Sequence, residues 1–204
     1  MHDWKEQKEG TVTDKETLIA RILAIEEKMF LSVPTAEPAP CQQHPEQFRL
    51  HRRSQFHAWN EDVLTSYLED LNDAMKSGEN LMTRKYARMD NLIPPREHHL
   101  IDEIVAIKYA WQKAMFENYP GIMNGARSLS RSEDTDFRTS FETYLRAELE
   151  TYSDETIRLL HAQVMEMLRA GRSMAEEIYS FLIREQGFSS LDEAELLIRT
   201  ENSW

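Results

Sequence analysis

The sequence is poor in cysteine and glycine, with one cysteine, Cys41, and six glycines in 204 residues. A single cysteine excludes a disulfide within the chain and fits a reducing compartment. Scattered glycines leave no Gly-rich phosphate loop and no dinucleotide fingerprint. The sequence contains no run of about 18 apolar residues, which is the length needed to cross a bilayer. The charged start MHDWKEQKEG lacks the apolar segment of a secretory signal. We therefore expect a cytoplasmic protein that has no nucleotide cofactor and does not span a membrane.

Metal motifs are also scarce. None of the seven histidines follows a Glu-x-x spacing, so a ferritin-like di-metal centre is not expected. Cys41-x-x-His44 has no second ligand pair and is weak as a zinc site. The segment 97–103 (EHHLIDE) contains i,i+4 pairs, for which solvated side chains at a helix start are the simpler interpretation. We expect no metal and no other cofactor.

The positive charge is outweighed but unevenly distributed. The net charge of −12 speaks against a broad nucleic-acid-binding surface, although not against a local basic patch. Residues 49–57 (RLHRRSQFH) carry three arginines and no acid, and residues 83–88 (TRKYAR) carry three basic residues. A basic surface there fits a phosphate-rich ligand. The alternative is that basic and acidic segments neutralise each other inside the protein.

The sequence has the pattern of an all-helical protein. No stretch shows sustained period-two alternation, and helix start and stop signals recur. The predicted starts are the capping boxes Thr13-x-x-Glu16, Thr139-x-x-Glu142 and Ser190-x-x-Glu193 with the N-caps Asn60 and Ser153, and the predicted stops are Gly78 and Gly171. A long helix is expected over about 96–118. We predict an all-α fold of eight or nine helices, interrupted by long loops at 32–47 and 118–138 that are either functional or disordered.

The chain also resembles itself. LIARILAI (18–25) matches LIDEIVAI (100–107) in five of eight positions, and residues 48–86 match 141–179 at an offset of 93. We predict two pseudo-equivalent helical repeats packed as one bundle-like domain. Chance similarity between amphipathic helices is the alternative. The expected boundaries are a disordered tail at 1–12 and one domain at 13–200, with repeats at 13–93 and 96–187 and a C-terminal helix at 190–200.

Four ionisable side chains fall on apolar helix faces: Glu26, Lys85, Lys108 and Glu148. On a wheel of roughly 100° per residue, Glu148 lies inside the stripe of Phe141 and its apolar neighbours. A carboxylate facing a core is costly unless it is paired. The four either form a buried network or line a polar pocket between the repeats. Lys85 and Lys108 are the two candidate partners of Glu148.

Four strings resemble a known family. They are CQ (41–42), RRSQFHAW (52–59), SYLEDLNDAMKSGENLMTRKYARM (66–89) and SEDTDFRTSFETYLRAELETYS (132–153). Over about residues 15–195 the chain resembles a bacterial and fungal helical family long catalogued as a domain of unknown function. Its fungal branch includes the arginine-containing cyclodipeptide synthases. That branch is associated with an Asp-Asp-x-x-Glu motif, which does not occur here; the nearest acidic cluster is Glu133-Asp134 with Asp136.

The resemblance implies an aminoacyl transferase of natural-product biosynthesis that joins arginine to a second amino acid as a 2,5-diketopiperazine. Its partners would be arginyl-tRNA and a second aminoacyl-tRNA, and it needs no metal. The candidate catalytic residues are Glu133, Asp134, Glu142 and Glu148, with Glu133 or Asp134 as general base. The candidate substrate-binding residues are Glu26, Gln55, Trp59, Lys85, Arg146 and Tyr152. The candidate tRNA-binding residues are Arg49, Arg52, Arg53, Arg84 and Arg88.

Within these sets, Glu148 is the first choice and Glu26 the second for pairing with a guanidinium. Trp59 or Tyr152 would stack on the terminal adenine. Two other classes of function stay open: a non-catalytic helical binding or scaffold protein, and an enzyme of the same family that acts on an amino acid or amine without tRNA.

Overall fold

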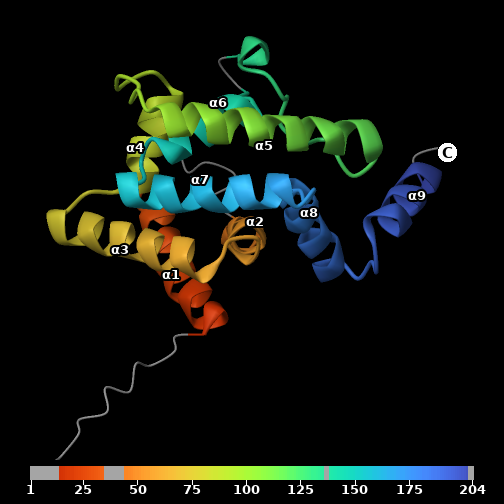
Figure 1. The fold of residues 1–204 in the computed structure, drawn as a ribbon, viewed down its shortest axis with the longest axis horizontal. Helices are drawn as coiled ribbons and strands as arrows, with labels where there is room; N and C mark the ends of the chain where they lie inside the picture. The colour runs from red at the N-terminus through yellow and green to blue at the C-terminus, as the bar shows by residue number, and fades with distance from the viewer. Residues whose placement is uncertain (1–13, 35–43, 136–137, 202–204) are drawn as a thin grey trace, which may run out of the picture.

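The computed structural model describes residues 14–34, 44–135 and 138–201, which form an all-α fold (Figure 1). The α-helices of these residues are α1 (Lys15–Leu31), α2 (Pro45–His57), α3 (Glu61–Ser77), α4 (Leu81–Met89), α5 (His99–Asn118), α6 (Phe141–Leu149), α7 (Asp154–Arg169), α8 (Met174–Glu185) and α9 (Leu191–Glu201). A short 3₁₀ helix, η2 (Arg131–Glu133), precedes α6. In the described ranges there is no strand, only an isolated bridge between Thr135 and Arg138. The predicted all-α class is confirmed.

Most helix ends fall where the capping signals predict. The side chains of Asn60 and Ser153 accept hydrogen bonds from backbone N–H groups in the first turns of α3 and α7. Gly78 ends α3 at φ 74°, a left-handed conformation that favours glycine. The predicted capping box at Thr139 is wrong, because the residue that caps α6 is Ser140, through Thr143 N. Thr13 and the predicted 1–12 tail lie outside the described residues.

The helices gather around α1 and α5. Helix α1 packs against α2, α3 and α4, and α5 packs against α6, α7 and α8. The two groups then meet through the pairs α2–α8, α4–α6 and α3–α7. The helices of the two groups follow the predicted offsets, for example Glu61–Ser77 and Asp154–Arg169. Helix order and spacing alone do not establish a common origin, so the duplication stays a prediction.

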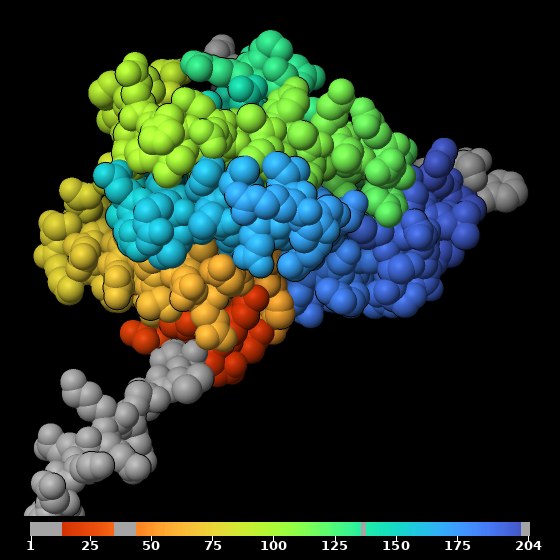
Figure 2. All heavy atoms as spheres, in the orientation of Figure 1, coloured from red at the N-terminus to blue at the C-terminus, as the bar shows by residue number. Residues whose placement is uncertain are grey.

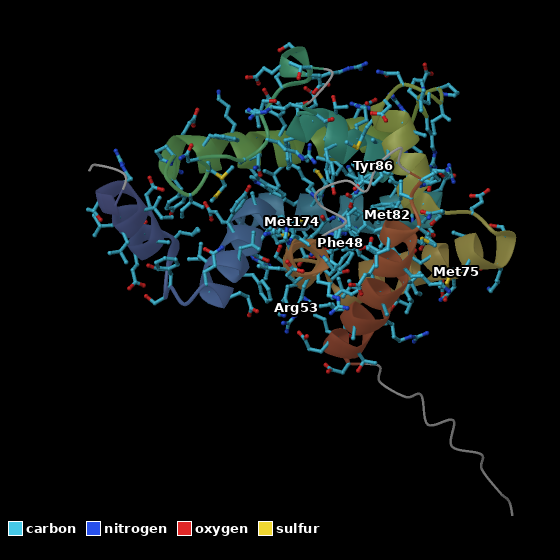
Figure 3. All side chains as sticks on the ribbon, turned by 180° about the vertical axis from the view of Figure 1, so that it is seen from behind. Phe48, Arg53, Met75, Met82, Tyr86 and Met174 are labelled. Atoms are coloured by element: carbon cyan, nitrogen blue, oxygen red, sulfur yellow. The ribbon has the colours of Figure 1, made fainter. Side chains whose placement is uncertain are left out.

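One apolar core lies between the two groups. Figure 2 shows α7 and α8 (cyan to blue) filling the band between α5 (green) and the yellow and orange helices α3 and α2. The core contains an aromatic cluster in which Trp59 makes edge-on contacts with Tyr67 and Tyr152. In Figure 3, Met82 and Phe48 lie near the middle of the molecule, and Met75, 44% exposed, lies near its edge. None of the described helices is long and apolar enough to cross a membrane.

A smaller apolar cluster attaches α9 to the end of α5. The buried Glu195 of α9 accepts hydrogen bonds from the backbone N–H groups of Gly121 and Ile122, both at 2.9 Å. The carboxylate thereby satisfies donors at the turn that follows α5. A Cβ at Gly121 would lie 2.9 Å from Glu195 Oε2, so a side chain at this position would displace the Glu195 carboxylate from its two donors.

Candidate active site: a buried ion network beside an open polar cleft

Glu148 lies in the main core with its carboxylate enclosed. Its Oε1 accepts hydrogen bonds from Arg52 Nη1 (2.8 Å), Gln55 Nε2 (2.9 Å) and Tyr152 Oη (2.6 Å). Its Oε2 accepts from Lys85 Nζ at 3.2 Å. Burial alone would raise the pKa of this carboxyl, but the charges of Arg52 and Lys85 outweigh burial and hold the pKa well below its usual value. Glu148 is therefore ionised and hydrogen-bonded at both oxygens.

Arg52 joins Glu148 to a second buried carboxylate, Glu26. The guanidinium donates to Glu26 through Nε at 2.7 Å and Nη2 at 2.6 Å, which is a bidentate pair. Tyr67 Oη donates to the same carboxylate at 2.5 Å. Two carboxylates thus balance two cations, Arg52 and Lys85, inside the core. Such a network is stable only when it is complete, and this one leaves neither carboxylate unpaired.

Lys108 lies beside this network without joining it. It is 7% exposed, and its ammonium has no ion pair or hydrogen bond to another described residue. Burial lowers its pKa to about 8, although the Glu148 charge acts in the opposite direction. All four predicted inward residues are therefore buried, and Lys85 rather than Lys108 is the lysine that pairs with Glu148.

The buried network occupies the side chains that were predicted to contact a substrate. Gln55 donates to Glu148, and neither Glu26 nor Glu148 has an oxygen free of protein donors. Trp59 and Tyr152 are 1% and 2% exposed and pack against each other and against Tyr67. The prediction that either ring offers a surface for a base is wrong for this structure, because core rings cover both.

The predicted tRNA-binding arginines fall into two groups. Arg52 and Arg88 are 3% and 8% exposed, so the prediction of a surface phosphate contact is wrong for both. The other three lie at the surface, each within 4 Å of a carboxylate, and Arg53 is labelled in Figure 3. The pairs are Arg49 with Glu27, Arg53 with Glu16 and Glu185, and Arg84 with Glu79. Much of the predicted basic surface is thus neutralised by the chain itself.

An open polar cleft lies on the other side of α6. It has two adjoining parts of about 760 and 390 Å³, formed by α4, the turn after it, the start of α5, η2 with the loop that follows, and α6. The lining carboxylates are Asp90, Glu97, Asp102, Asp134, Glu142 and Glu150, and the lining arginines are Arg88, Arg96, Arg131 and Arg146. Six acids against four arginines give the cleft a mildly acidic wall, to which His98 and His99 add two titratable rings.

The inner wall of the cleft is formed by Glu150 and Arg88. Glu150 ends α6 two residues after Glu148, about 200° further around the helix, and so faces the cleft instead of the core. Its Oε2 accepts from Arg88 Nε at 2.6 Å. Its Oε1 is buried and has no hydrogen-bond partner among the described residues, and the same holds for His98 Nδ1. An unpartnered carboxylate oxygen in a buried position is unusual.

The rim of the cleft brings together residues from three segments. Arg146 Nη1 pairs with Asp102 Oδ1 at 2.7 Å, and Glu142 Oε2 accepts from Arg131 N at 2.9 Å. The Arg131 guanidinium is exposed and has no ion pair within the described residues. Among all the residues that the structure describes, no group of three or more His, Cys, Asp or Glu side chains is arranged to hold a metal ion.

The loop that closes the outer part of the cleft is held by Asp134. Asp134 Oδ1 accepts from Ser140 N at 2.6 Å, and its Oδ2 accepts from Thr143 Oγ1. Burial opposes ionisation of this carboxyl, but the hydrogen bonds from Thr143 and Ser140 lower its pKa below the usual value. The neighbouring Glu133 accepts from Ser130 N and caps η2. Asp134 therefore anchors the loop to α6, and Glu133 is committed to the loop itself.

The predicted site residues therefore fall into two places, the cleft and the buried core. Asp134, Glu142, Arg88 and Arg146 line the cleft, whereas the Glu26 and Glu148 network lies in the core. Glu150 is not among the predicted site residues, because helix periodicity selects residues on the core stripe and Glu150 lies on the opposite face of the same helix.

The fold and cleft define an all-α protein with a polar, ligand-sized site between helices. The chain belongs to the family described as "Protein of unknown function (DUF4125)", whose model matches residues 16–196. No curated protein and no solved structure shows significant similarity to it.

Proposed function

We propose that this chain is an aminoacyl-transferring enzyme that forms a cyclodipeptide in the cleft, with aminoacyl-tRNA as the donor. The observation that carries the proposal is the cleft itself. It is of ligand size, and carboxylates and arginines from four chain segments line it. It also contains Asp134, Glu142 and Arg146 of a string by which the chain resembles the family that includes the synthase branch.

The chemistry needs positioning and one proton acceptor. The α-amine of one aminoacyl group attacks the ester carbonyl of the other, a C–N bond forms, and the C–O bond to the tRNA ribose breaks. A carboxylate takes the proton from the amine and returns it to the departing ribose oxygen. The same attack within the dipeptidyl ester closes the ring and releases the second tRNA. Since the ester is already activated, no metal or nucleotide is needed at this step.

Glu142 is the carboxylate best placed for that proton transfer. It lines both parts of the cleft, and one of its oxygens remains uncommitted after Oε2 has bound Arg131 N. Asp134 also lines the cleft, but its lowered pKa and its bonds to the α6 start make it a weak proton acceptor. Arg131 and Arg146 supply positive charge for phosphate or carboxylate groups at the rim.

The test is mass spectrometry of a reaction with the pure protein, tRNA, arginyl-tRNA synthetase, ATP and amino acids, with and without RNase. The expected product has the mass of arginine plus a second amino acid minus two waters, and RNase abolishes it. Glu142→Gln should reduce its rate by at least about a hundredfold, as expected for a lost general base. Glu27→Gln, which removes a partner of Arg49 outside the cleft, should leave it unchanged.

Two observations favour a second enzymatic candidate, which acts without tRNA. The surface arginines Arg49, Arg53 and Arg84 are each within 4 Å of a carboxylate, and the chain carries a net charge of −12. Both disfavour tRNA binding. An enzyme that takes an amino acid or amine from a soluble activated donor would give a product that survives RNase. Absence of any product from folded protein would refute the tRNA-dependent proposal and favour either the scaffold or an enzyme that acts without tRNA.

A further inference from the structure

The outer face of α9 exposes apolar side chains at one end of the molecule. Leu196 is 65% exposed and Leu197 is 44% exposed, so α9 is the helix of the described residues that exposes two consecutive large apolar side chains. Its inner face is already engaged, because Leu191 and Ala194 are buried in the small apolar cluster with residues of α5 and α8. A surface helix normally has one apolar stripe. Helix α9 therefore has a second apolar surface, which packing within the described residues leaves exposed.

A groove of about 340 Å³ borders this surface, between α9 and the end of α5. Leu196 and the ring of Tyr119 supply apolar surface to the groove. Asp192 lines it on the first turn of α9 and Arg199 lines it on the last turn. An acidic and a basic side chain thus lie at opposite ends of the same helix face, with an exposed leucine between them.

The Arg199 guanidinium is only weakly engaged. Its side chain is 67% exposed, and its Nε lies 3.9 Å from Glu195 Oε1. The Glu195 oxygens already accept hydrogen bonds from Gly121 N and Ile122 N, both at 2.9 Å. A guanidinium has five N–H donors, so Arg199 retains donors for a carboxylate outside this chain.

A second α9 in antiparallel orientation matches this pattern. Along the helix, Asp192 lies about 6 Å before Leu196 and Arg199 lies about 4.5 Å after it. Two copies of α9 that pack antiparallel across a twofold axis at Leu196 bring each Arg199 next to Asp192 of the second copy, and the two Leu196 side chains meet between these pairs. A parallel pair would instead place like charges against each other, which is unfavourable.

We propose that the outer face of α9 is the docking surface for a second copy of this chain, which binds through its own α9 in antiparallel orientation to form a twofold dimer. Exposed apolar surface with charged residues at its border is typical of protein–protein contacts. Two helices of eleven residues provide a small interface compared with the roughly 1,200–2,000 Å² of stable complexes. We therefore expect a dissociation constant in the micromolar range.

The dimer leaves the cleft open. His99 and Asp102 at the start of α5 line the cleft, whereas Figure 1 shows α9 beyond the other end of α5. The twenty residues of α5 separate the two places by about 30 Å. The inference is therefore independent of the proposed function. A monomeric protein would refute the dimer alone, and failure to form a cyclodipeptide would refute the proposed function alone.

The experiment is sedimentation velocity of the full chain over a concentration range of about 1–200 µM, where a micromolar dimer dissociates. We expect a monomer–dimer equilibrium. Leu196→Glu places two like charges at the twofold axis and should weaken association at least about tenfold. The matched control is Leu92→Glu, because Leu92 is 75% exposed in the turn after α4, far from α9, and association should persist. A monomer at every concentration, or unchanged association of the Leu196→Glu protein, would overturn the inference.

Charge exchange tests the antiparallel orientation. Arg199→Glu and Asp192→Arg should each weaken association, because each single change brings like charges together in both symmetric pairs. The double variant exchanges the two charges and should restore association to about the level of the unaltered chain. Circular dichroism confirms that each variant keeps its helices. A double variant that associates no better than the single variants would refute the antiparallel arrangement.

Discussion

Replacing Glu148 by glutamine tests whether the buried network is structural. The change keeps the shape of the side chain and removes one charge. Arg52 would retain Glu26 as a bidentate partner, but Lys85 would lose its only carboxylate and keep Tyr144 as a neutral hydrogen-bond acceptor at 2.7 Å. The network, now balanced between two carboxylates and two cations, would carry an excess positive charge in a buried place.

The expected cost follows from that imbalance. Removing one partner of a buried ion pair typically costs about 3–5 kcal/mol, because the other charge stays buried without compensation. For a chain of this size, about 2–4 °C of melting temperature correspond to 1 kcal/mol, so we expect a fall of roughly 6–20 °C. The double variant Glu148→Gln with Lys85→Met restores the charge balance and should recover a substantial part of the loss.

Urea unfolding followed by circular dichroism measures these values. The control is Glu155→Gln, because Glu155 pairs with Arg158 at 2.5 Å on the surface, where solvent screens an ion pair and its contribution to stability is small. A Glu148→Gln protein within about 1 kcal/mol of the unaltered chain would refute the structural role. So would a double variant that is less stable than the sum of the two single changes.

Three further predictions use other parts of the structure. The folded pKa of Lys108, about 8, lies below its unfolded value of 10.5, so the unfolded chain binds more protons between these values and stability should rise from pH 8 to 10.5. Lys108→Met should remove this rise and should stabilise the protein at pH 7 by up to about 3 kcal/mol. Thermal unfolding at each pH measures both effects. The folded pKa of Glu148 is lowered, so its contribution should be complete above pH 4.5 and decline as pH falls below it, and acid unfolding of Glu148→Gln should show a smaller decline. Gly121→Ala should displace the Glu195 carboxylate, break two hydrogen bonds to the backbone and destabilise the packing of α9 by roughly 1–3 kcal/mol. Hydrogen exchange at the Ile122 amide measures this effect, and unchanged protection there would contradict the close contact.

Much of the fold could be predicted because its signals are local. A side-chain oxygen at Asn60 or Ser153 reaches its own helix, and glycine at Gly78 adopts a left-handed conformation whatever packs around it. The inward position of Glu148 followed from helix periodicity alone. Thr139 was mistaken for the cap because Thr and Ser at adjacent positions carry the same signal, and only the backbone path decides between Thr139 and Ser140.

The site could be predicted only in part, because partner choice depends on where distant helices lie. The sequence placed Glu26 and Glu148 in the core, and the tertiary structure decided that Arg52, 96 residues before Glu148, reaches both of them. Arginines at positions 49, 52 and 53 look alike in a basic string, yet one helix face buries the middle one. Charge alone carries no information on that difference.

Local patterns were sufficient to predict the helices, most of their ends and the costly charges on apolar faces, since these follow from interactions within a few residues. The pairing of those charges depends instead on how distant helices pack. Glu148 and Glu150 are two residues apart on one helix, and one closes a core network while the other faces a cleft with a free oxygen. That difference arises because both α2 and α4 bring a cation to Glu148, whereas Glu150 is bound by Arg88 of α4, and no local pattern encodes the positions of these helices.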